Sequence, residues 1–72
     1  MDMTISEKIR VLLGRRSMTV TALAKEMNIS RQYMTKKLKD NDFTVWELKK
    51  IAGLLGCDFE AVFVARDSGE RI

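Results

Sequence analysis

The residues Asn28-Ile29-Ser30 constrain the fold more than any other stretch, because two helix-like patterns meet there with almost nothing between them. Asparagine tolerates the left-handed backbone conformation that ends many helices. The Ser30 hydroxyl can cap the next helix, and Ile29 and Met34 have the spacing of a hydrophobic staple around that cap. The pattern therefore predicts that one helix ends at Asn28 and that another starts at Arg31.

Cap signals also predict the other helix starts. Residues 4–7 and 44–47 each read Thr-x-x-Glu, which is the pattern of a capping box. Thr19 is a further cap candidate, and apolar residues follow each cap at helical spacing. The sequence thus predicts helices over about residues 4–15, after Thr19, from Arg31, and from Thr44 until Gly56 stops the last one. Trp46 in that last helix is expected to pack over the core, with a place at an interface as the alternative.

The C-terminal segment, residues 58–72, allows two interpretations. Its apolar residues have helical spacing behind Asp58, yet residues 62–64 are rich in β-formers and residues 66–69 read as a turn. We predict a β-hairpin, with a fifth helix as the alternative. The expected fold class is mainly α, a compact four-helix domain over residues 1–57 followed by this segment.

Composition excludes several classes of protein. The chain of 72 residues has no histidine and only one cysteine, Cys57, so the usual zinc clusters and histidine-based catalysis are absent. No nucleophile–base pair is evident, so we expect neither an enzyme nor a cofactor. No stretch is long and apolar enough to span a membrane, and no signal peptide is evident, so we expect a cytoplasmic protein with no membrane partner.

Positive charge is concentrated in one segment. The formal net charge is only +3, but residues 31–39 hold four basic side chains and no acidic one. Residues 43–72 hold four basic and five acidic side chains, for a net charge of −1. A local basic helix after a tight turn is typical of the helix-turn-helix unit, whose second helix enters the major groove of DNA.

Two stretches carry a family resemblance. The chain resembles the Cro/repressor (XRE) family of bacterial and phage DNA-binding domains over about residues 5–57, in LAKEMNISRQYMTKKLK and the following FTVWELKKIAGLLG. It departs from the family at Asn28, where glycine is usual, and near Lys37, where an apolar residue is usual. The resemblance implies a repressor-like helix-turn-helix fold that binds double-stranded DNA.

Four side chains are predicted to read DNA bases. Burial of Met34 and Leu38 would leave the opposite face of this helix outward. Arginine can bridge O6 and N7 of guanine, glutamine can bridge N6 and N7 of adenine, and threonine can bond a base edge or touch a thymine methyl. The predicted base contacts are Arg31, Gln32, Thr35 and Lys36.

The resemblance also implies phosphate contacts from the start of the second helix and from the loop after the third. For Tyr33 two roles remain open, a phosphate contact through its hydroxyl or a place at the edge of the core. The predicted phosphate contacts are Thr19, Val20, Thr21, Tyr33, Lys39 and Asn41.

The expected function is sequence-specific binding of double-stranded DNA by a small transcriptional regulator. One helix-turn-helix reads too few base pairs for specificity, so we expect a homodimeric repressor on a palindromic operator. Dimerisation is predicted through residues 58–72, with Phe59, Val62, Phe63 and Val64 at the interface. The rival interpretation is a protein-interaction module that holds a toxin or another regulator.

Overall fold

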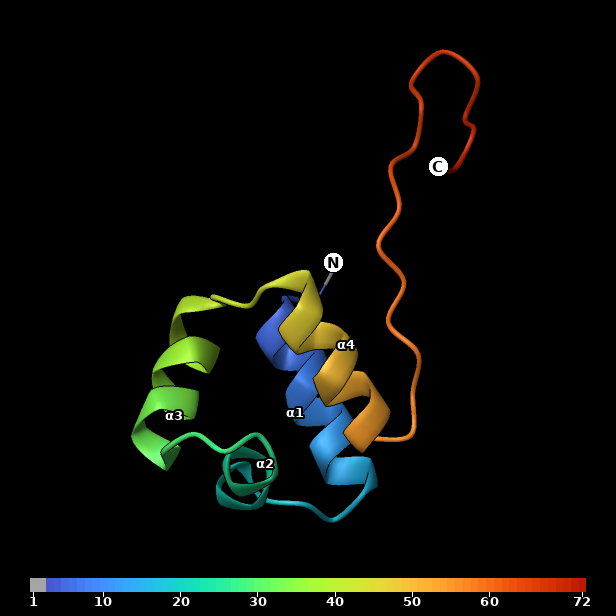
Figure 1. Cartoon of the computed structure of the whole chain (residues 1–72). Coiled ribbons are helices and arrows are strands. Elements are labelled where there is room, and N and C mark those ends of the chain that lie inside the picture. Colours follow the sequence, from blue (N-terminus) through green and yellow to red (C-terminus); the bar gives the residue numbers. More distant parts are fainter. Residues whose placement is uncertain (1–2) are drawn as a thin grey trace.

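Four helices form the compact part of the protein. The computed structural model describes residues 3–72, in which the helices are α1 (Ile5–Arg15), α2 (Val20–Glu26), α3 (Arg31–Asp40) and α4 (Val45–Leu54). α1 and α4 lie side by side, and α2 and α3 form a corner at one end of the bundle (Figure 1). No helix within residues 3–72 is long and apolar enough to cross a bilayer.

The predicted helix starts are confirmed at all four N-caps. The hydroxyls of Thr4, Thr19, Ser30 and Thr44 each accept a hydrogen bond from the backbone N–H three residues later. Both capping boxes are complete, since the carboxylates at the third helical position accept from the backbone N–H of their cap residues. Each such cap satisfies donors that a helix N-terminus otherwise leaves unpaired.

The tight corner between α2 and α3 is built as the sequence predicts. Asn28 has φ 60°, in the left-handed region, and Ile29 donates its N–H to the Ala24 carbonyl at 3.0 Å. The Ile29 side chain packs against the core, and α3 starts directly after Ser30. The chain therefore turns a corner over only a few residues, which brings α3 into contact with α2.

All four helices contribute to one hydrophobic core. Its most deeply buried large side chains come from α2, α3, the end of α4 and the residue after it: Leu23, Met34, Leu38, Ile51 and Leu55. α1 adds Ile9 and Leu13, each 4% exposed. Full burial of one such side chain stabilises a fold by about 1.5–3 kcal/mol. Burial of Met34 and Leu38 therefore makes two such contributions to holding the inner face of α3 against the core.

Lys37 makes an unusual buried contact between α3 and α4. Its side chain is only 8% exposed, and its Nζ lies 3.0 Å from Oε2 of Glu47. The same Nζ lies 5.1 Å from the ring centroid of Tyr33 and 5.5 Å from that of Phe43, within cation–π range. Because Glu47 also closes the capping box at Thr44, this ion pair ties α3 to the first turn of α4.

Lys37 and Glu47 shift each other's pKa. The hydrogen bond to Glu47 raises the pKa of Lys37, against a smaller opposing effect of burial. The backbone N–H of Thr44, together with Lys37, lowers the pKa of Glu47. Both groups are therefore held in their charged forms around neutral pH.

The C-terminal prediction was wrong in its details. After Phe59, which packs against the core, the chain runs away from the helices, and a turn then brings it back (Figure 1). A single antiparallel bridge joins Val64 and Arg71, so neither a two-stranded β-hairpin nor the alternative fifth helix forms within residues 3–72. An isolated hairpin is only marginally stable in water, and no other part of the described chain packs against residues 62–72 to stabilise one.

Trp46 also differs from the prediction. Its side chain is 68% exposed, and the Nζ of Lys50 lies 5.4 Å from its ring centroid. The core over α4 is filled instead by Leu48, Ile51 and Leu55, which lie on the opposite side of the helix. Trp46 therefore covers no part of the core.

Replacing Lys37 tests the contact between α3 and α4. Lys37→Ala should lower the free energy of unfolding by about 2 kcal/mol, because it leaves the partly buried Glu47 carboxylate without its cation. The matched control Lys36→Ala removes an exposed lysine one residue away and should change stability by less than about 0.5 kcal/mol. Urea denaturation measures both, and equal effects of the two changes would show that the pair contributes nothing.

The lowered pKa of Glu47 predicts a pH dependence of stability. A carboxylate with a depressed folded-state pKa contributes stability above its unfolded pKa, about 4.3 for glutamate, and loses it as pH falls through the folded value. Glu47→Gln keeps a hydrogen-bond acceptor for the cap but should lower stability at pH 7 and flatten the acid limb. Glu7→Gln, at a capping box whose carboxylate has no ion pair in residues 3–72, is the control. Thermal unfolding from pH 7 to 3 should show the larger loss for Glu47→Gln at neutral pH, and the difference between the two variants should shrink as pH falls below about 4.3.

Candidate nucleic-acid interface

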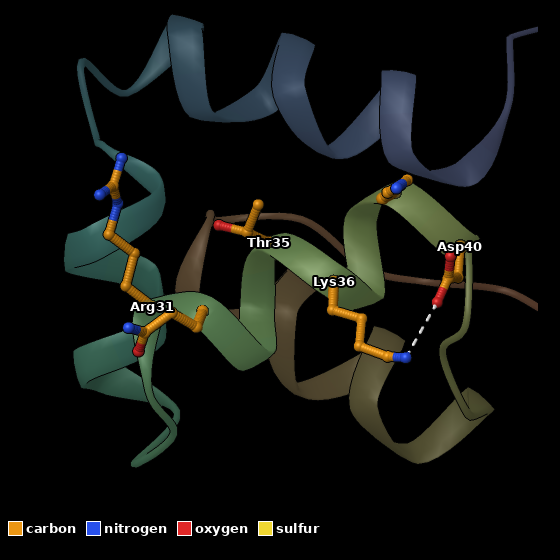
Figure 2. Close-up of a pocket in the computed structure, with 6 residues that line it drawn as sticks. Arg31, Thr35, Lys36 and Asp40 are labelled. Atoms are coloured by element: carbon orange, nitrogen blue, oxygen red, sulfur yellow. Dashed lines mark ion pairs between the residues drawn. The ribbon is translucent and has the colours of Figure 1, made fainter.

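The outward face of α3 forms a shallow hollow with a volume of about 500 Å³. All of its lining side chains belong to exposed residues of one helix, and Figure 2 shows them projecting from α3. The lining residues are Arg31, Gln32, Thr35, Lys36, Lys39 and Asp40. All four predicted base contacts therefore lie on one surface, together with Lys39 from the predicted phosphate set.

The orientation of this face follows from the residues on the other side of α3. Met34, Lys37 and Leu38 are buried at 0%, 7% and 2% exposure. With 3.6 residues per turn, fixing these positions inward leaves positions 32, 35, 36 and 39 outward. The hydrophobic core thus determines which polar side chains α3 presents.

The hollow has both charges, with an excess of positive ones. Arg31, Lys36 and Lys39 supply cations, and Asp40 supplies the single acidic group of the lining. Lys36 Nζ lies 3.8 Å from Asp40 Oδ2, and both side chains remain largely exposed (Figure 2). Arg31, at the other end of the face, and Lys39 form no ion pair within residues 3–72. Their charges are therefore available to an anionic partner.

Some of the predicted phosphate contacts have exposed side chains, and others have side chains that are used within the fold. Thr19 and Thr21 are exposed, although the Thr19 hydroxyl oxygen already accepts from the Ala22 N–H at 3.0 Å. Tyr33 is 51% exposed, and the Nζ of Lys37 lies 5.1 Å from its ring centroid. Val20 packs against the core, so its side chain does not face a phosphate.

Asn41 has a structural contact that sequence reasoning missed. It caps α3 with φ 50°, and its Oδ1 accepts a hydrogen bond from the Ser6 N–H at 2.9 Å. The Ser6 hydroxyl donates to the Leu38 carbonyl in the same place. Asn41 therefore joins the end of α3 to the first turn of α1, and its amide oxygen is already occupied.

The predicted interface residues of the C-terminal segment differ in how exposed their side chains are. Phe59 packs against the core, close to a small apolar hollow between α1 and α4. Val62, Phe63 and Val64 are 44%, 82% and 56% exposed. Three of the four residues are therefore available at the surface, and Phe59 is used within the domain.

Two residues of the site were missed at the sequence level. Asp40 belongs to the hollow, and its spacing of four residues from Lys36 is the signal for a helical ion pair. Lys37 stands out in the sequence as a charge at an expected apolar position, but nothing local to it predicts Glu47 as its partner. No group of three or more His, Cys, Asp or Glu side chains within residues 3–72 could hold a metal ion.

Comparison with known proteins agrees with this geometry. The family model of the Cro/C1-type HTH DNA-binding domain matches residues 8–67, most of the chain. No curated protein and no solved structure matches the chain significantly. The match includes the α2–α3 corner and the whole exposed face of α3. The protein therefore belongs to the Cro/C1-type family of helix-turn-helix DNA-binding domains.

Proposed function

We propose that this domain is a transcriptional regulator that binds specific double-stranded DNA sequences by placing α3 in the major groove. The observation that carries the proposal is the hollow on α3, where six exposed polar side chains lie opposite a fully anchored inner face. A B-DNA major groove about 12 Å wide admits one α-helix, and the second helix of this motif is the one that enters it.

The side chains of the hollow suit base recognition. Arg31 and Gln32 stand in the first turn of α3, where this motif reaches base edges. Arg31 has the geometry to bridge two acceptors of guanine, and Gln32 can pair with the acceptor and donor of adenine. Thr35 and Lys36 extend the same face by one turn, so the four residues can read several consecutive base pairs.

Phosphate contacts would orient the domain on the duplex. Lys39 lines the hollow and forms no ion pair within residues 3–72. Thr19 and Thr21 at the start of α2, and Tyr33 on α3, are exposed. Contacts of this kind fix register and supply the salt-dependent part of the affinity. Val20 could contribute only through its backbone N–H, because its side chain packs against the core. Asn41 keeps its amide NH2 as a donor for a phosphate, because its contact with Ser6 uses only the amide oxygen.

We also propose that the regulator is a dimeric repressor on a palindromic operator. A single recognition helix covers only about four or five base pairs, and a two-fold dimer doubles this length. The C-terminal segment supports the dimer, because Val62, Phe63 and Val64 are exposed apolar residues beside one β-bridge. Extended backbone whose N–H and C=O groups are not all paired can pair with another chain.

The exposed C-terminal segment also favours a second candidate function, in which the domain holds another protein, such as a toxin or regulator. Phe63 at 82% exposure and Ile72 at 72% would then contact that protein rather than a second copy. Under this alternative, apolar residues of the segment would dominate partner binding, and changes on α3 would have little effect.

Substitutions on α3 test the DNA proposal. Arg31→Ala or Gln32→Ala should each weaken binding to a selected duplex by about 1–3 kcal/mol and relax preference at one base pair. Lys49→Ala, which removes an exposed lysine from α4, is the matched control and should have a much smaller effect. Fluorescence anisotropy with selected and scrambled duplexes at several salt concentrations makes the comparison. An equal loss in Arg31→Ala and Lys49→Ala on both duplexes, with no loss in Gln32→Ala, would indicate only general charge attraction.

Shortening the C-terminal segment tests the dimer. Deleting residues 61–72 keeps Phe59 and all four helices, so the helical circular dichroism should be unchanged. Sedimentation should show a shift from dimer to monomer, and affinity for a palindromic site should fall at least about tenfold while affinity for a half-site is retained. A shortened protein that binds the palindrome as tightly as the full chain would rule out this interface.

A further inference from the structure

Asp40 is a surprising member of the α3 hollow. It is the only acidic residue among the six that line the surface, and DNA presents phosphates on both sides of the major groove. A carboxylate placed there is repelled by the backbone and gains nothing from general charge attraction. Its presence on this face therefore calls for a specific role in the complex.

The partner of Asp40 shows what that role requires. Lys36 Nζ lies 3.8 Å from Asp40 Oδ2, one helical turn along the same face (Figure 2). Exposed pairs of this type are weak, so each group can exchange its partner for another of matching charge or polarity. Together they present one donor and one acceptor side by side to whatever enters the hollow.

A G·C base pair offers the complementary arrangement. In the major groove guanine presents the O6 and N7 acceptors, and cytosine presents the N4 amino donor. The guanine O6 and cytosine N4 are hydrogen-bonded to each other, which sets them about 2.9 Å apart. An ammonium and a carboxylate 3.8 Å apart thus match an acceptor and a donor at nearly the same spacing.

We infer that Lys36 and Asp40 act as one reading unit for a G·C base pair, with Lys36 donating to guanine and Asp40 accepting from cytosine. This inference rests on the proposed placement of α3 in the major groove. An A·T pair also presents an amino donor, at adenine N6, but only guanine presents two adjacent acceptors to the Lys36 ammonium, so the pair as a whole favours G·C. Asp40 is therefore a specificity-determining residue.

α3 is long enough for Arg31 and the Lys36–Asp40 pair to contact different base pairs at the same time. A rise of about 1.5 Å per residue places Asp40 about 14 Å along the helix axis from Arg31. Successive base pairs are about 3.4 Å apart, so the two ends of the hollow lie about four base pairs apart. A helix lying along the groove would therefore use Arg31 at one end of a half-site and the Lys36–Asp40 pair at the other.

Site selection with substituted full-length proteins tests the inference. Sites are selected from a random duplex pool by the wild type, by Asp40→Ala and by Lys36→Ala, and all single-base-pair variants of the best site are then measured. Wild type should prefer G·C at one position of the half-site, and both variants should lose about tenfold of that preference at the same position. Asp40→Ala should also bind unrelated duplexes more tightly, because a like charge has been removed.

The control is Asp42→Ala, which removes an equal charge two residues later from an exposed residue outside the hollow. It should leave base preferences at every position unchanged. If Asp40→Ala selects the same bases as wild type at every position, Asp40 acts only through its charge and the inference is overturned. If wild type itself shows no preference among duplexes, the proposed function fails, and the inference fails with it.

Discussion

Burial of Met34 and Leu38 is the constraint on which the rest of the site depends. Both side chains are almost completely removed from solvent, so α3 cannot rotate about its axis without exposing a large apolar area. The turn at Asn28 and the Ser30 cap fix where the helix begins. The rotation of α3 about its axis and the residue at which it begins together determine which six side chains line the hollow.

Contacts near the C-terminal end of α3 complete this restraint. The Lys37–Glu47 ion pair joins α3 to the first turn of α4, and Asn41 joins the end of α3 to α1 through Ser6. These polar contacts have defined distances and directions, so they fix geometry more sharply than apolar packing alone. A recognition helix held in this way has little freedom left to lose when it meets a rigid groove, which favours selective binding.

Local signals predicted the helical part of the fold well, because caps and turns depend on residues only a few positions apart. Thr4, Thr19, Ser30 and Thr44 all cap the helices they were expected to cap, and Asn28 has the expected left-handed backbone. The outward set on α3 was predictable for the same reason, since helical periodicity alone separates Gln32 and Lys36 from Met34 and Leu38.

Contacts between distant residues were not predictable in this way. Lys37 and Glu47 are ten residues apart, and Ser6 and Asn41 are 35 apart, so no local pattern joins them. Trp46 was misjudged because apolar composition does not say which neighbour is present to bury a side chain. The C-terminal segment lacks such a neighbour within the described chain, and only one bridge forms there.

The central claim is that the outer face of α3 contacts the bases of a DNA duplex. The most direct test is a titration of the isotope-labelled protein with a selected duplex, followed through its backbone amide and side-chain NMR signals. We expect the largest changes, and intermolecular contacts to base protons, at Arg31, Gln32, Thr35 and Lys36. Changes confined to residues 58–72 or to the faces of α1 and α4, with α3 unaffected, would contradict it.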